Sequence, residues 1–239
     1  MTLRIGFDMD GTLADFGRAF HEVEERLFGP VPGISEGYPE REEEAQAEAL
    51  ETPPIVQDRM EVSPSTPQDS RRRRSLIWKA IQATPDFWCT LHPIEADAVS
   101  RIHALMLLHK WEVFFITQRP YTSGDTVQRQ TQKWLVDQGF DLPSVLVLGG
   151  TRGTAAAALR LSYHVDDSPQ NCMDVISDSR ARPILIVPDT DEVGIASAHA
   201  LGIGTAPGIG ACLDVLERAT LAAANPSLFE RLASMVGWW

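Results

Sequence analysis

Acidic and hydroxyl side chains stand at the ends of three short apolar runs that lie far apart in the sequence. Asp8 and Asp10 directly follow the first run, Thr117 ends the second, and Asp166 and Asp167 end a later one. Carboxylates grouped in this way can bind a hard cation, act as nucleophiles, or transfer protons. Each Asp taken singly would more often be a helix cap or a turn residue, but that reading is weak for the whole set.

Five apolar runs of strand length would position these side chains. They are mostly β-branched or aromatic and are bounded by polar or turn residues, which predicts buried parallel strands at 3–7, 112–116, 145–148, 163–165 and 183–187. Helical patterns lie between most of them, at 94–109, 126–138 and 152–161. This alternation predicts an α/β fold with a Rossmann-like, doubly wound parallel sheet.

The predicted sheet brings the polar side chains together. Residues just beyond the carboxyl ends of neighbouring parallel strands converge on one crevice, so we expect three carboxylates from the two acidic segments to meet the hydroxyl of Thr117 there. So much negative charge is unstable without a cation. Since we expect hard carboxylate oxygens there with no His or Cys ligand nearby, Mg²⁺ is favoured over zinc.

The interval between the first and second predicted strands is too long for a single crossover helix. We predict that 15–91 form a cap, mainly helical, inserted into a core made of 1–14 and 92–239. Helical patterns occupy 14–28 and 75–83. The stretch 35–67 is rich in Pro, Glu and Gln and has no apolar period, so it could be a loop of the cap or a mobile arm.

Composition narrows the classes of partner. The chain of 239 residues carries 33 acidic and 21 basic residues, a formal net charge of −12, which disfavours a face for extended nucleic acid. It has no apolar stretch long enough to span a membrane. Three widely spaced cysteines without metal-binding spacing and the lack of a signal-peptide pattern lead us to expect a cytoplasmic protein. The oligomeric state, including a homodimer, is left open.

Three segments resemble motifs of the haloacid dehalogenase superfamily of phosphatases, in the same order and on predicted strands. They are DMDGTL at 8–13, FIT at 115–117 and HVDD at 164–167. The resemblance implies phosphomonoester hydrolysis with Asp8 as the nucleophile that forms an aspartyl-phosphate and Asp10 as general acid and base. It also implies that Thr117 donates a hydrogen bond to the phosphoryl group.

The resemblance further implies a Mg²⁺ ion bound by Asp8, by the backbone carbonyl of Asp10, and by Asp166 or Asp167. The third motif of the superfamily is a Lys or Arg that neutralises the phosphoryl group, and here the sequence offers alternatives. Lys133 on the predicted helix 126–138 and Arg152 at the start of 152–161 both qualify, separately or together. Arg119 is a further candidate.

Within the superfamily, the chain is most similar to the 5′(3′)-deoxyribonucleotidases, over 1–28 and 76–190. The likeness is carried by DMDGTLADF at 8–16, by the segments 87–94 and 133–136, and by DDSP at 166–169. It implies that Phe16 stacks on a nucleobase and that Phe87 and Trp88 line the base pocket. The alternative for these aromatic residues is ordinary packing inside the cap.

Four positions depart from that family and concern substrate contacts. Gln118 and Arg119 follow Thr117 where the family has Ser and then Pro, and Thr131 and Thr154 stand where lysines are typical. We therefore expect Gln118 and Arg119 to contact a substrate that is a small phosphorylated metabolite, with a nucleoside monophosphate as the specific hypothesis. A sugar phosphate or another small metabolite is the alternative among enzymes. A protein that binds a phosphate ligand or a partner without turnover is the alternative of another class.

Overall fold

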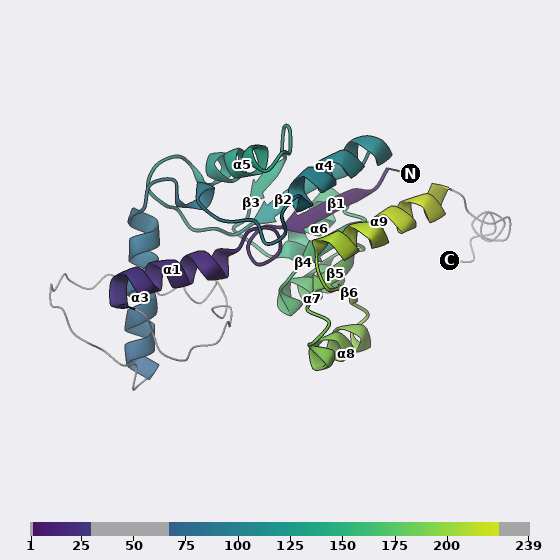
Figure 1. Ribbon diagram of the computed structural model, residues 1–239. Helices are drawn as coiled ribbons and strands as arrows, with labels where there is room; N and C mark the ends of the chain where they lie inside the picture. Colours follow the sequence, from purple (N-terminus) through teal and green to yellow (C-terminus); the bar gives the residue numbers. More distant parts are fainter. Residues whose placement is uncertain (1, 30–66, 225–239) are drawn as a thin grey trace.

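The core of the protein is a six-stranded parallel sheet. The computed structural model describes residues 2–29 and 67–224 (Figure 1), and the strand order is β3-β2-β1-β4-β5-β6. The strands are β1 Arg4–Asp8, β2 Glu112–Thr117, β3 Val145–Val147, β4 Tyr163–Asp166, β5 Arg182–Ile186 and β6 Gly204–Ala206. The α/β fold class and the five predicted strands are confirmed. β6 was not predicted, because its three residues form no apolar run.

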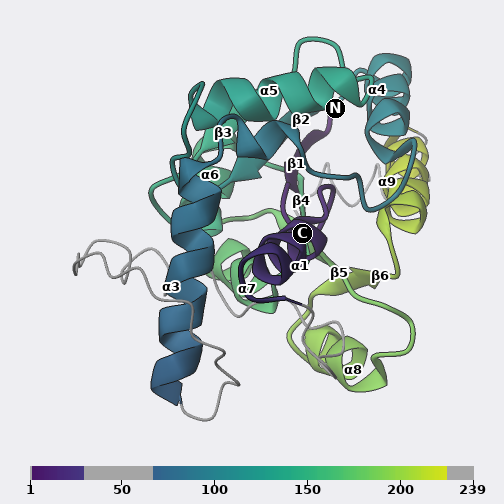
Figure 2. The same ribbon diagram turned by 60° about the vertical axis from the view of Figure 1, so that its left-hand side comes forward.

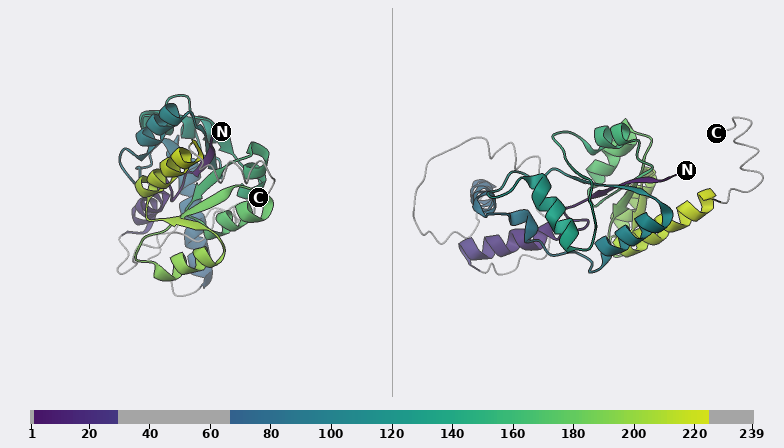
Figure 3. Two further views of the ribbon diagram at one scale, coloured as in Figure 1. Left: turned by 90° about the vertical axis from the view of Figure 1, so that its right-hand side faces the viewer. Right: turned by 90° about the horizontal axis from the view of Figure 1, so that it is seen from above.

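Helices cover both faces of the sheet, as the right-hand view of Figure 3 shows. Alternate side chains of β2 face opposite layers: Phe115 packs in one cluster with residues of α4, α5 and α9, and Ile116 packs in another with residues of α6 and α7. α8 packs against β5 and α7 through Leu185 and Cys172. The helices are α4 Ala98–His109, α5 Val127–Asp137, α6 Arg152–Leu159, α7 Pro169–Asp178, α8 Glu192–Ala200 and α9 Ile209–Ala224.

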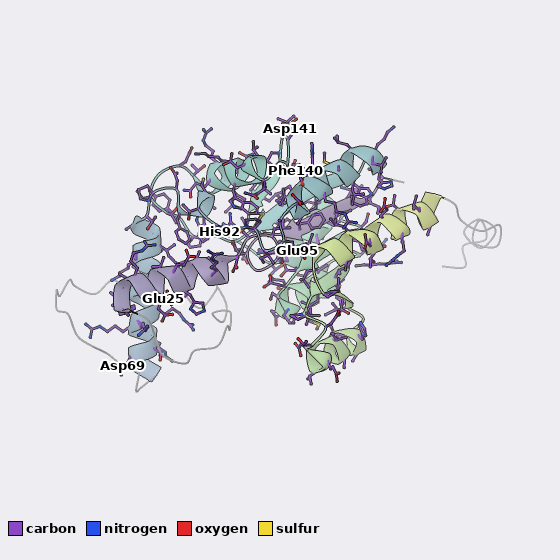
Figure 4. All side chains as sticks on the ribbon, viewed as in Figure 1. Glu25, Asp69, His92, Glu95, Phe140 and Asp141 are labelled. Carbon is purple, nitrogen blue, oxygen red and sulfur yellow. The ribbon has the colours of Figure 1, made fainter. Side chains whose placement is uncertain are left out.

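The predicted helix 94–109 begins later than its pattern suggested. The backbone of Ile94 donates to the carbonyl of Leu13, so this residue belongs to the loop that closes against the turn after β1. The carboxylate of Glu95, labelled in Figure 4, accepts hydrogen bonds from the backbone N–H groups of Ile209 and Gly210. Glu95 therefore caps the amino end of α9, where a negative charge complements the helix dipole.

The described residues between β1 and α4 form three helical elements. They are α1 Phe16–Phe28, α3 Pro67–Ala83 and the short 3₁₀ helix η1 Phe87–Cys89. Figure 2 shows α3 crossing beside α1. Arg73 joins the two helices, because its Nε donates to Glu24 at 2.6 Å and its guanidinium lies 4.4 Å from the ring centre of Phe28.

The limits 15–91 for a separate cap remain a prediction, since the stretch 30–66, with its Pro- and Glu-rich part, lies outside the described residues. The same holds for the last part of the predicted core, 225–239. α3 is longer than the predicted 75–83 and includes the arginine run that precedes it. Among the helices of the described ranges, none combines the length and the apolar character needed to cross a membrane.

Candidate active site

The predicted acidic residues meet at the carboxyl ends of β1 and β4. These strands are neighbours at the point where the order of the sheet reverses, which is where parallel α/β sheets form a crevice. Asp8, Asp166 and Asp167 each place a carboxylate oxygen within 4.8 Å of the other two. Asp8 and Asp166 are buried, and Asp167 is half-buried. The structure therefore groups three acids that come from strands in two distant parts of the chain.

A tight turn after β1 gives Asp167 its place. The backbone N–H groups of Leu13 and Ala14 both donate to the carbonyl of Met9, and Gly11 adopts φ +83° inside the turn. A Cβ atom at Gly11 would lie 2.1 Å from Oδ2 of Asp167, so a side chain is excluded there. Thr12 donates from Oγ1 to Oδ1 of Asp167 at 3.2 Å and holds the carboxylate against the turn.

The positively charged guanidinium of Arg152 contacts the carboxylate of Asp8. Thr151 caps α6, which places Arg152 at the first turn of that helix with its side chain buried among the acids. Its Nη2 donates to Oδ1 of Asp8 at 2.7 Å, and its Nε lies 3.7 Å from Oδ2 of Asp166. Lys133 lies instead on α5, where its charge acts on the Cys89 thiol. Of the two cations predicted for this role, Arg152 is the one in contact with Asp8.

Arg119 forms a bidentate salt bridge with Asp10, the acidic residue of the turn after β1. Its Nε donates to Oδ2 of Asp10 at 2.8 Å and its Nη2 donates to Oδ1 at 2.7 Å. Thr117, at the end of β2, donates from Oγ1 to the same carboxylate at 3.4 Å. Nε2 of Gln118 donates to the carbonyl of Gly150 at 3.0 Å, two residues before Arg152. Asp10, Thr117 and Arg119 thus form a connected group beside Asp8.

Asp166 is held by donors on both of its oxygens. Oδ1 accepts from the backbone N–H of Ser168 at 2.9 Å, Oδ2 accepts from Nε2 of His164 at 2.9 Å, and Nδ2 of Asn171 donates to both oxygens. Burial acts to raise the pKa of this carboxyl, but the hydrogen bond from His164 and the charge of Arg152 outweigh it and lower that pKa. Asp166 is therefore an ionised carboxylate with little capacity left for another ligand.

Asp167 has the opposite electrostatic character. Burial raises the pKa of its carboxyl to about 7, and the negative charges of Asp166 and Asp10 add to the effect. A cation would relieve this repulsion, and the carboxylate oxygens gathered here are the ligands that Mg²⁺ prefers. The residues present therefore fit a divalent cation held by Asp8 and Asp167, with Asp166 behind them.

His164 is part of the site although the sequence assigned it no role. Its side chain is wholly buried, and Nδ1 has no hydrogen-bond partner among the described residues. It pairs across the sheet with Gly6, where a Cβ atom would lie 2.9 Å from Nδ1. The one available signal was the spacing: His164 and Asp166 are two residues apart on a strand, so they share a face.

The aromatic residues predicted to hold a base pack against one another. Phe16 lies 5.5 Å from Trp78, 5.7 Å from Trp88 and 5.9 Å from Phe20, measured between ring centres, and Phe87 lies 5.2 Å from Trp88. No ring of this group is more than 7% exposed. In the described conformation these rings form a small core between α1, α3 and η1.

The comparisons with known proteins identify the fold. No family model matches the chain, and no curated sequence matches it. A Thermotoga maritima protein assigned as a beta-phosphoglucomutase superposes with a TM-score of 0.53 at 19% identity, covering 91% of this chain and 99% of the other. A haloacid dehalogenase-like hydrolase from Streptococcus pneumoniae gives 0.52 at 14% identity, covering 91% and 98%. The chain has the fold of haloacid dehalogenase-like hydrolases.

Proposed function

We propose that the protein is a Mg²⁺-dependent phosphomonoester hydrolase that works through an aspartyl-phosphate on Asp8. The observation that carries the proposal is the cluster of Asp8, Asp166 and Asp167 with Arg152 bound to Asp8. A group of three carboxylates and one buried guanidinium suits a phosphoryl dianion and a divalent cation, because charge neutralisation dominates phosphoryl transfer. The shared fold supports the same conclusion.

The cation would be held by Asp8, Asp167 and the backbone carbonyl of Asp10, and it would neutralise charge on the phosphoryl oxygens. Asp8 attacks phosphorus through a carboxylate oxygen, and the bond from phosphorus to the leaving oxygen breaks. Arg152 donates to Oδ1 of Asp8, and from there its charge stabilises the negative charge that builds on the phosphoryl group. The product of this step is Asp8 carrying the phosphoryl group and the free alcohol.

Asp10 supplies the proton chemistry in the proposal. It is two residues from Asp8, at the start of the turn in which Gly11 adopts a positive φ. In the first step it donates a proton to the leaving oxygen. In the second step its carboxylate takes a proton from water, the water oxygen attacks phosphorus, and the bond to Asp8 breaks. Thr117, which contacts Asp10, donates a hydrogen bond to the phosphoryl group.

The substrate is a small phosphorylated metabolite, and a nucleoside monophosphate is the specific hypothesis. The aromatic group of Phe16, Trp78, Phe87 and Trp88 supports it, because flat rings suit a nucleobase. A sugar phosphate is the second candidate. It is favoured by the mutual packing of those rings, which would have to separate to admit a base.

The test is a phosphatase screen of nucleoside monophosphates and sugar phosphates with Mg²⁺ and with EDTA. We expect Mg²⁺-dependent release of phosphate and, after rapid acid quenching, a phosphorylated chain detected by mass spectrometry. Asp8→Asn serves as the matched control that cannot form the intermediate. Tight binding of inorganic phosphate without turnover of any substrate would instead identify a non-catalytic phosphate-binding protein.

A further inference from the structure

We propose that Arg119 is a positioning residue that fixes the carboxylate of Asp10 for the hydrolysis of the phosphorylated Asp8. The inference rests on the proposed function and assigns Arg119 to the second half of the reaction, where the sequence suggested a contact with substrate. Arg119 and Asp10 form a bidentate pair, called the fork below, in which Nε and Nη2 of Arg119 donate to the two oxygens of Asp10 at 2.8 and 2.7 Å.

The guanidinium of Arg119 is fixed from several sides. Its Nη1 donates to Oγ1 of Thr131 on α5 at 2.9 Å. Its central carbon lies 4.8 Å from the ring centre of Trp88, and the indole N–H of Trp88 donates to the carbonyl of Pro120 at 3.0 Å. The side chain of Arg119 is completely buried, while 6% of the Asp10 side chain is exposed. Arg119 is therefore anchored by protein groups, and Asp10 is the residue it presents to the crevice.

The geometry suits a carboxylate that has to receive a proton. A fork of this kind occupies one lone pair on each oxygen and fixes the plane of the group. A further lone pair remains for a water molecule, because the single hydroxyl proton of Thr117 goes to the phosphoryl group when substrate is bound. In the hydrolysis step, water gives its proton to Asp10, its oxygen forms the new bond to phosphorus, and the bond between phosphorus and Asp8 breaks. A carboxylate that can rotate would meet that water in the correct orientation less often.

A substrate whose leaving group needs no proton distinguishes the positioning of Asp10 by Arg119 from a direct contact of Arg119 with the phosphoryl group. With p-nitrophenyl phosphate, nitrophenolate leaves unprotonated, so phosphorylation of Asp8 does not depend on the orientation of Asp10. We expect Arg119→Met to release about one equivalent of nitrophenolate per active site in a burst. Steady turnover should then be slower than in the wild type by about 10- to 100-fold, the range expected for a misplaced catalytic group.

Three further measurements sharpen the test. Arg119→Lys should behave like Arg119→Met, because an ammonium group cannot form the fork. Thr131→Val should give a smaller change in the same direction, and this variant keeps the test valid if Arg119→Met fails to fold. Arg129→Met is the matched control: it also breaks an Arg–Asp pair, but an exposed one with Asp125. It should match the wild type.

The competing role would be a direct contact with the phosphoryl group. In that case Arg119→Met would raise the inhibition constant of inorganic phosphate and abolish the burst, and our inference would be overturned. We expect the inhibition constant to stay at the wild-type value. A failure of the proposed function looks different, since the wild type itself would then release no nitrophenolate and form no phosphorylated chain.

Discussion

Arg152 donates a hydrogen bond to Asp8 at 2.7 Å across a separation of 144 residues. Both side chains are almost completely buried, and Oδ2 of Asp166 lies 3.7 Å from Nε of the same guanidinium. A buried cation between two carboxylates neutralises charge that would otherwise destabilise the folded protein. The same arrangement leaves Arg152 next to the atom that would carry the phosphoryl group, so one contact serves stability and the proposed chemistry.

Replacing Asp8 should stop the reaction. We expect Asp8→Asn to lower kcat by several orders of magnitude, because an amide cannot form the phosphorylated intermediate. Steady-state rates and the mass of the acid-quenched chain measure this directly, and circular dichroism checks the fold. Near-normal turnover in this variant would show that Asp8 is not the nucleophile.

Replacing Arg152 should distinguish it from Lys133. We expect Arg152→Met to lower kcat roughly 10²- to 10³-fold, as for the loss of a donor to a developing oxyanion. Lys133→Met should have a much smaller effect, since Lys133 lies on α5, whereas Arg152 is the cation in contact with Asp8. Rates for both variants on one substrate provide the comparison. If the Lys133 variant lost more activity, Lys133 would be the cation of the third motif.

Mg²⁺ should stabilise the protein more at pH 8 than at pH 6. The pKa of Asp167 is raised to about 7, so without metal the folded state retains a proton that the unfolded chain releases near pH 4. The metal-free protein therefore loses stability as the pH rises from about 4 to about 7. Above that range the ionised Asp167 can bind Mg²⁺ directly, whereas below it Mg²⁺ has to displace a proton.

Thermal unfolding with Mg²⁺ and with EDTA at both pH values measures this difference. Asp167→Asn is the control, because an amide has no proton to lose in this range. In that variant the shift in Tm on adding Mg²⁺ should be small and equal at pH 6 and pH 8. An equal shift at both pH values in the wild type would contradict the assignment of Asp167 as a ligand.

Truncating Phe16 tests the nucleotide hypothesis. Since Phe16 packs on three other rings, we expect Phe16→Ala to lower the free energy of unfolding by about 3–5 kcal/mol. The nucleotide hypothesis predicts in addition that KM for a nucleoside monophosphate rises roughly 5- to 150-fold, with p-nitrophenyl phosphate unaffected. An equal loss on all substrates would show that Phe16 only packs in the core of these helices. KM values for both substrates decide between packing and base binding.

The sequence alone determined the sheet and the position of the acids in it. Strand-length apolar runs and the residues that end them are local patterns. Because the carboxyl ends of parallel strands lie at the same edge of the sheet, these patterns predict that the residues share one crevice. The sequence therefore predicts that Asp8, Asp166 and Asp167 meet, and the structure groups them. β6 and the loop around Glu95 were missed, because short polar segments depend on contacts with distant parts of the chain rather than on their own period.

Only the tertiary structure decided which side chains pair inside the crevice. Arg119, Lys133 and Arg152 are all candidate cations by sequence, and what separates them is where α5, α6 and the loop after β2 place each charge. The pairing of His164 with Asp166 and the packing of Phe16 against Trp78 also required coordinates. The physical reason is common to these cases: spacing along a strand assigns a residue to a face, but the partner it meets depends on rotamers and on elements folded from remote segments.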